Sequence, residues 1–154
     1  MQAPAIRLAQ PADREPLSRL RHALWPESSA ADHAAELSQI FAGEPLGILP
    51  LVIFVAQSGD GMLVGFIEAG LRSCADGCDP SQPVGYVEGW YIAEPHRRLG
   101  IGAALPRAAE DWARGQGCSE MASDAQLENL QSQRAHEALG FVAIERSVLY
   151  RKPL

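Results

Sequence analysis

A strand, a basic turn with two glycines and a helix follow one another in the second half of the chain. Residues 84–92 are aromatic and β-branched, which is typical of a buried strand, and residues 103–114 are rich in alanine at helical spacing. Arg-Arg-Leu-Gly-Ile-Gly occupies positions 97–102 between them. Glycines let backbone N–H groups approach a ligand closely, and a helix start supplies unpaired donors and the positive end of its dipole. The turn is therefore predicted to hold a pyrophosphate group.

Two other phosphate-binding patterns do not fit this turn. A dinucleotide-binding fingerprint needs Gly or Ala three residues after Gly102, where this chain has Leu105, and an acidic residue about 20 residues further on. A nucleoside-triphosphate loop needs Gly-Lys followed by Ser or Thr, which is absent from the sequence. A glycine helix start with solvated arginines stays open as a purely structural alternative.

The length and the lack of a long polar run favour one domain over residues 1–154. The first residues lack the pattern of a signal peptide, and no apolar run approaches the roughly 18 residues of a membrane span, so we expect a cytoplasmic protein without a membrane segment. The 13 Lys and Arg residues against 19 Asp and Glu residues give a net charge of −6. This charge argues against a nucleic-acid partner and permits a cationic one.

The three cysteines do not form a metal-binding pattern. Cys74 and Cys78 lie close together, but neither a second cysteine pair nor a nearby histidine pair completes a tetrahedral site. Cys118 stands apart from both. Free thiols without a metal are therefore expected.

Periodicity and turn residues predict alternating strands and helices in the order β-α-α-β-β-β-α-β-α-β. Ser28 and Ser29 are candidate caps for the second helix, and Ser-Gly-Asp-Gly at positions 58–61 indicates a hairpin. The predicted strands span residues 6–9, 51–57, 62–71, 84–92, 120–123 and 141–151, and the predicted helices span residues 11–24, 30–43, 103–114 and 129–139.

The turn also matches Arg/Gln-x-x-Gly-x-Gly/Ala, the coenzyme A pyrophosphate motif of the GCN5-related N-acetyltransferases (GNAT), which this chain resembles. Asn129, His136 and the sequence Leu-Gly-Phe at positions 139–141 are similar to the family's asparagine, tyrosine and Gly-Phe signature. The predicted element order agrees with that of the family. The resemblance implies an α/β (α+β) fold with a mixed, mostly antiparallel central sheet flanked by helices, and acetyl-CoA as co-substrate without a metal.

Longer runs are similar to one branch of this family, the aminoglycoside 6′-N-acetyltransferases. These runs cover residues 20–26, 88–90, 117–124 and 137–146. The resemblance implies direct acetyl transfer to the 6′-amine of an aminoglycoside in a ternary complex, and a homodimer. The loop at positions 73–82 departs from the branch, because it lacks the usual aromatic residue and His-Asp pair. Two alternatives stay open: an acetyltransferase for another small cationic amine such as a polyamine, and a non-catalytic acyl-CoA sensor.

The resemblance also assigns the cofactor-binding residues. In the family, the backbone of the turn binds the pyrophosphate and the asparagine contacts the pantetheine arm. The predicted cofactor-binding residues are Ile92, Arg97, Arg98, Leu99, Gly100, Ile101, Gly102 and Asn129.

Two carboxylates are candidates for binding and deprotonating the amine. An alkylamine with a pKa near the lysine reference of about 10.4 arrives protonated and must lose a proton before it attacks the thioester. Glu88 lies inside the predicted strand that leads to the turn, and Gly89 favours a β-bulge there, which frees backbone N–H groups for the thioester. Asp124 ends the next predicted strand, at the edge where open sheets bind ligands. Glu88 and Asp124 are therefore predicted to face one cleft, although Asp124 also suits a turn or a helix start.

Trp25 and His136 complete the candidate site. Trp25, at the end of the first predicted helix, suits either the floor of a sugar-binding site or the core. His136 occupies the family's tyrosine position, where the tyrosine often protonates the departing thiolate. A buried structural histidine is the alternative.

Overall fold

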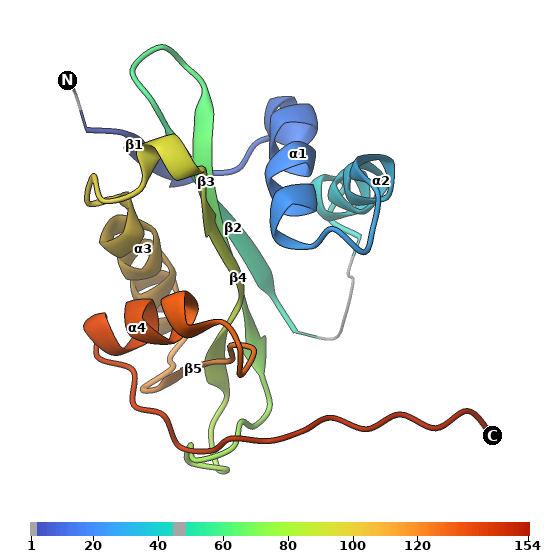
Figure 1. Cartoon of the computed structure of the whole chain (residues 1–154), viewed down its shortest axis with the longest axis vertical. Helices are drawn as coiled ribbons and strands as arrows, with labels where there is room; N and C mark the ends of the chain where they lie inside the picture. The colour runs from blue at the N-terminus through green and yellow to red at the C-terminus, as the bar shows by residue number, and fades with distance from the viewer. Residues whose placement is uncertain (1–2, 45–48) are drawn as a thin grey trace. The chain divides into compact units, whose positions relative to one another are not determined.

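The computed structural model describes residues 3–44 and 49–154 and divides the chain into two compact units, Met1–Ser123 and Asp124–Leu154. The first unit holds the sheet and helices α1 (Arg14–Leu24), α2 (Ala30–Phe41) and α3 (Ile101–Gly115), and the second holds helix α4 (Leu130–Ala138) (Figure 1). The candidate residues of the turn and of the strand before it lie in the first unit. Asp124, Asn129 and His136 lie in the second.

A five-stranded sheet forms the centre of the first unit, with the strands in the order β1-β2-β3-β4-β5. Its strands are β1 (Ala5–Leu8), β2 (Leu51–Gln57), β3 (Leu63–Arg72), β4 (Val84–Ile92) and β5 (Met121–Ser123). The first four pair antiparallel with their neighbours, whereas β4 and β5 are parallel. The predicted mixed, mostly antiparallel sheet is therefore confirmed.

The hairpin between β2 and β3 forms at the predicted turn. The amide of Ser58 donates to the carbonyl oxygen of Met62 over 2.9 Å, and the amide of Gly61 donates to the carbonyl oxygen of Ser58 over the same distance. Gly61 has φ +90°, which a residue with a side chain adopts only under strain. The turn residues thus fix the register of β2 and β3, which supply Ile53, Val55 and Phe66 to the core.

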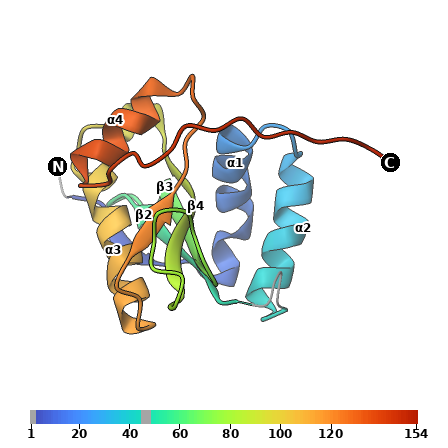
Figure 2. The same cartoon turned by 90° about the horizontal axis from the view of Figure 1, so that it is seen from below.

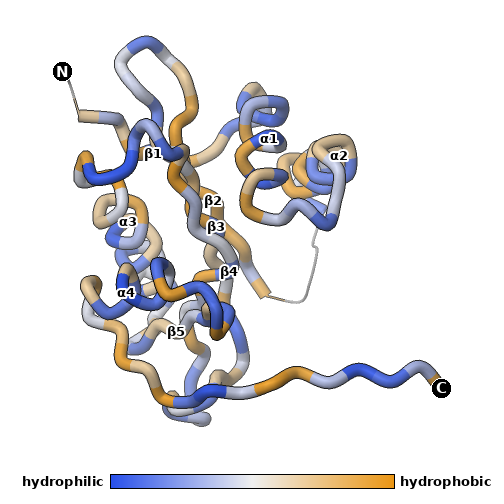
Figure 3. The backbone as a smooth tube through the Cα atoms, in the orientation of Figure 1, coloured by the Kyte–Doolittle hydropathy of each residue, from blue (hydrophilic) through white to orange (hydrophobic). Residues whose placement is uncertain are grey.

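Helices cover both faces of the sheet in the first unit. Figure 2 shows α1 (Arg14–Leu24) and α2 (Ala30–Phe41) on one side and α3 (Ile101–Gly115) on the other. Ser29 caps α2 through a capping box with Asp32, whereas Ser28 lies outside the cap. The main core cluster consists of Leu17, Leu37, Ile53, Val55 and Phe66, from α1, α2 and the sheet. Figure 3 shows apolar colour along β2 and β3, the strands that supply Ile53, Val55 and Phe66.

The second unit contains α4 (Leu130–Ala138) and a segment without regular structure. The predicted helix is confirmed, but the strand predicted at 141–151 is wrong: residues 141–154 contain no strand. Their side chains are largely exposed, with Leu149 and Tyr150 each 93% exposed. The local sequence was not enough to predict this segment, because a strand forms only where a neighbouring strand pairs with its backbone hydrogen-bonding groups.

Candidate active site

The turn between β4 and α3 has the geometry expected from its glycines. Gly100 is the N-cap of α3 and has φ +80°, a left-handed conformation that glycine adopts without strain. The amides of Ala103 and Ala104 both donate to the carbonyl oxygen of Gly100 over 3.2 Å. The amides just before them begin the helix, where no earlier helical turn offers a carbonyl oxygen. They form a set of donors that suits a phosphate oxygen.

The two arginines of this turn have different surroundings. The Nε of Arg97 donates to the carbonyl oxygen of Ile92 over 2.9 Å, and its guanidinium carbon lies 5.8 Å from the centre of the Tyr91 ring. Arg97 therefore ties the turn to the end of β4. Arg98 is exposed and has φ +64°, the only positive φ outside glycine in residues 3–44 and 49–154. Arg98 is thus the arginine that carries charge into solvent beside the helix start.

A β-bulge interrupts the pairing of β3 and β4 at the predicted place. Glu68 pairs with Gly89 and the next residue of β3, Ala69, pairs with Val87. Glu88 is the extra residue between them. A bulge leaves its extra residue out of the ladder and bends the strand. The side chain and backbone of Glu88 are therefore set apart from the regular sheet.

Two guanidinium nitrogens of Arg72, Nε and Nη2, donate to the carboxylate of Glu88. Its Nε lies 3.1 Å from Oε1 and its Nη2 lies 2.8 Å from Oε2. The guanidinium carbon also lies 3.4 Å from the centre of the Tyr86 ring. Arg72 was not predicted, because an arginine at the end of a strand has no signature of its own. Glu88, the acidic residue expected on the neighbouring strand, was the only feature of the sequence that indicated a cationic partner there.

Trp25 packs beside the bulge and also borders the core. A Cβ atom added at Gly89 would overlap the Trp25 ring, so this contact requires glycine. The ring meets Phe66 edge-on with 6.0 Å between centroids, and the guanidinium of Arg21 lies 5.3 Å from its centre. Trp25 is half-buried. Both predicted roles, core residue and site wall, are compatible with this position.

Buried charges lie under this region. Arg21 is 3% exposed and pairs with Glu36 at 2.7 Å and with Glu68 at 3.3 Å. Burial raises the pKa of Glu68 to about 7, although Arg21 opposes the shift. Sequence reasoning missed Glu68. The signal was available, since an acidic residue inside an apolar strand is the pattern that singled out Glu88.

The candidates of the second unit take part in its local structure. Asp124 directly follows β5, as predicted. The Oδ1 of Asn129 accepts the amide of Ser132 over 3.0 Å and so caps α4. The Nδ1 of His136 donates to the carbonyl oxygen of Ser132 over 2.7 Å, and its ring meets Phe141 edge-on. Glu88 belongs to the other unit, so its meeting with Asp124 in one cleft stays a prediction.

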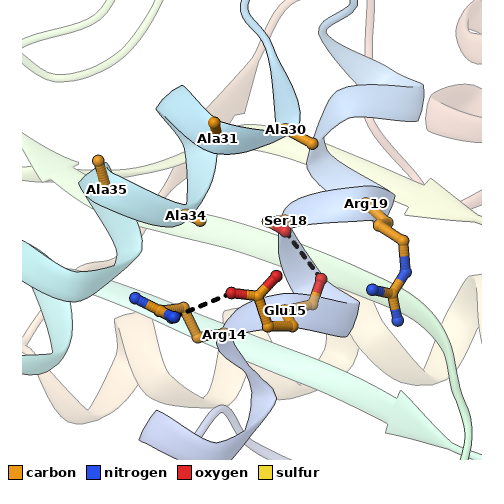
Figure 4. A pocket seen from close by; sticks show the side chains of 8 residues that line it. All are labelled: Arg14, Glu15, Ser18, Arg19, Ala30, Ala31, Ala34 and Ala35. Carbon is orange, nitrogen blue, oxygen red and sulfur yellow. Dashed lines mark hydrogen bonds and ion pairs between the residues drawn. The ribbon is translucent and has the colours of Figure 1, made fainter.

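A hollow of about 560 Å³ lies between α1 and α2 in the first unit (Figure 4). It is lined by Arg14, Glu15, Ser18, Arg19, Ala30, Ala31, Ala34 and Ala35. Arg14 pairs with Glu15 at 2.9 Å, and the hydroxyl of Ser18 donates to the carbonyl oxygen of Glu15. The hollow contains none of the predicted site residues.

The described residues contain no cluster of metal-binding side chains. In residues 3–44 and 49–154, no three His, Cys, Asp or Glu side chains gather as metal ligands do. Cys74, Cys78 and Cys118 are free thiols, and burial raises the pKa of Cys78. Among the same described residues, no helix has the length and apolar character needed to cross a membrane.

Comparison with known proteins identifies the family. A profile of the Acetyltransferase (GNAT) family matches residues 17–141. The chain belongs to this family. Its α/β fold is the GNAT fold, since the solved structure of the aminoglycoside acetyltransferase AAC(6′)-Iy, with a TM-score of 0.87 and 35% identity, matches 99% of this chain and 100% of that one. That structure holds a bisubstrate analogue, CoA-S-monomethyl-acetylneamine.

Named relatives of this GNAT chain come from several bacteria. The aminoglycoside N(6′)-acetyltransferase type 1 of Serratia marcescens is 47% identical over 136 residues, which cover 88% of this chain and 89% of that protein. The enzyme of the same name from Klebsiella aerogenes is 38% identical over 152 residues, covering 99% of this chain and 98% of that protein. These similarities extend over both structural units.

Proposed function

We propose that this GNAT enzyme acetylates the 6′-amine of aminoglycosides with acetyl-CoA, by direct transfer in a ternary complex. One observation carries the proposal: a solved relative that matches 99% of the chain binds an analogue of CoA and acetylneamine together. The enzyme thus belongs to the acyltransferases. Its substrate is a small polycation, which suits a chain with a net charge of −6.

Acetyl-CoA binds at the start of α3 in this proposal, and the reaction needs no metal. The left-handed Gly100 places consecutive amides at the helix start, and exposed Arg98 adds positive charge beside them. Arg97 shapes the turn through its bond to the carbonyl oxygen of Ile92. The proposed cofactor-binding residues are Ile92, Arg97, Arg98, Leu99, Gly100, Ile101, Gly102 and Asn129.

Glu88 and Asp124 receive the amine in this proposal. Val87 and Ser123 form the last pair of the parallel β4–β5 ladder. Glu88 follows Val87 in the chain, and Asp124 follows Ser123 just after the end of β5. Two carboxylates bind the substrate ammonium, and one of them takes its proton, directly or through water. The amides freed by the bulge support the thioester oxygen as negative charge develops on it.

Trp25 and His136 have supporting roles in the proposed site. Trp25 lies against Gly89, next to Glu88, and offers a flat ring for a sugar. The Nδ1 of His136 already donates to the carbonyl oxygen of Ser132, so its Nε2 is the atom that would give a proton to the departing thiolate. Trp25, Glu88 and Asp124 are thus the proposed substrate-binding residues.

We further propose a single N-acetyltransferase domain across residues 1–154. The family match over residues 17–141 crosses the boundary between the two structural units, which supports one functional domain. We place the enzyme in the cytoplasm, where its three free cysteines would stay reduced.

A homodimer is the proposed assembly. The segment 141–154 exposes large apolar side chains, including Val148 at 64% and Leu149 at 93%. Exposed apolar patches of this kind commonly mark an interaction surface. A second copy of the chain is the partner proposed for them.

A panel of amines tests the proposed function. We expect thiol release from acetyl-CoA with a 6′-amino aminoglycoside and none with its 6′-hydroxy counterpart. Glu88→Gln and Asp124→Asn should each lower kcat/KM by about tenfold or more, because each removes a charge that pairs with the ammonium. Reaction with spermidine alone would contradict the aminoglycoside assignment, and binding of acetyl-CoA without any turnover would indicate a sensor.

A further inference from the structure

Arg72 holds the carboxylate of Glu88. Both of its oxygens accept from Arg72, at 3.1 Å for Oε1 and 2.8 Å for Oε2. Two parallel bonds between a guanidinium and a carboxylate fix the plane of the carboxylate as well as its position. This matters at Glu88, because the bulge removes the neighbouring ladder bonds that would otherwise set its direction.

The fold also holds Arg72 in place. Arg72 is the last residue of β3 and pairs with Val84, so its side chain shares a face with Tyr86 and Glu88 further along β4. Gly70, the partner of Tyr86, has no side chain to cover that ring. The guanidinium carbon of Arg72 lies over the ring at 3.4 Å from its centre. Stacking and strand position together direct the guanidinium toward the bulge.

We propose that Arg72 is a positioning residue that orients the carboxylate of Glu88 to receive the substrate ammonium. The inference rests on the proposed role of Glu88 in amine binding. A carboxylate has two lone pairs on each oxygen, and Arg72 uses one on each. The remaining lone pairs accept the ammonium, so arginine and substrate bind together rather than compete. An oriented carboxylate loses less side-chain freedom when the substrate arrives.

Kinetics of Arg72→Ala and Arg72→Lys test this role. Arg72→Ala should lower kcat/KM for a 6′-amino aminoglycoside about tenfold, with acetyl-CoA affinity by calorimetry and Tm unchanged. Arg72→Lys should recover only part of the lost kcat/KM, because an ammonium cannot form the two parallel hydrogen bonds of a guanidinium. The matched control is Arg14→Ala, since Arg14 is similarly exposed, at 47% against 46% for Arg72, and also pairs with a glutamate.

A double-mutant cycle separates positioning from other roles. If Arg72 acts through Glu88, Arg72→Ala should cost nothing further in the Glu88→Gln background. Equal losses in both backgrounds, or a gain in kcat/KM for Arg72→Ala alone, would overturn the proposal. Wild-type kcat/KM for Arg72→Lys would also overturn the proposal. Wild-type kinetics for Glu88→Gln would instead contradict the proposed role of Glu88, and so the two failures are distinguishable.

Discussion

Glu68 links the stability of the fold to pH through one side chain. Burial raises the pKa of its carboxyl from the ordinary 4.5 to about 7, against the opposing effect of Arg21. The folded chain therefore binds this proton more tightly than the unfolded chain does. By linkage, Glu68 contributes stability below pH 4.5, and this contribution is lost as the pH rises through about 7.

Glu68→Gln should remove this pH dependence. Glutamine stays neutral, so the free energy of unfolding of the wild type should fall relative to the variant between pH 5 and 8, by at most about 1.4 kcal/mol per pH unit. Urea denaturation at both pH values measures the difference. Glu15→Gln, which changes an exposed acid, is the control. A wild-type-minus-variant difference that is the same at both pH values would contradict the raised pKa of Glu68.

At the scale of elements, the packing of α1 against β4 depends on the absence of a side chain at Gly89. A Cβ there would overlap the ring of Trp25, which follows the last residue of α1. Gly89→Ala should therefore lower the free energy of unfolding by about 1–3 kcal/mol, as overpacked sites do. It should also lower kcat/KM, because Glu88 is the neighbouring residue. Urea denaturation and steady-state kinetics measure both effects.

Gly59→Ala is the matched control for Gly89→Ala. A Cβ at Gly59, in the hairpin turn, would meet nothing within 4 Å. This variant should retain wild-type stability and kinetics. Similar losses in both variants would show that the contact with Trp25 is not the cause.

Local sequence predicted most of these elements and the bulge at the candidate site. Ser29 marked the start of α2, and Glu88 with Gly89 marked the bulge, because caps and bulges depend on residues close in sequence. Arg72 could not be found in this way, since its role depends on a contact with Glu88 on another strand. The strand expected at 141–151 was wrong for a related reason: its existence depends on a partner strand rather than on its own pattern.

At the scale of the whole molecule, the exposed segment 141–154 should decide the assembly. Leu149→Asp together with Tyr150→Asp places charge where two large side chains are each 93% exposed. If this segment forms the dimer contact, the wild type should have the mass of a dimer by light scattering and the double variant that of a monomer. The control is Leu8→Asp, since Leu8 is 55% exposed on β1. A monomeric wild type, or a dimeric double variant, would contradict the proposed contact.

The positive φ angles at Arg98 and Gly100 have a consequence for how a ligand is received. The backbone of this turn already holds an uncommon conformation, fixed by the bond from Arg97 to the carbonyl oxygen of Ile92 and by the bonds of Ala103 and Ala104 to Gly100. A preorganised loop gives up little conformational entropy on binding, so more of the contact energy becomes affinity. The same rigidity makes the turn selective, since binding an anion of another shape would require a backbone rearrangement that costs free energy.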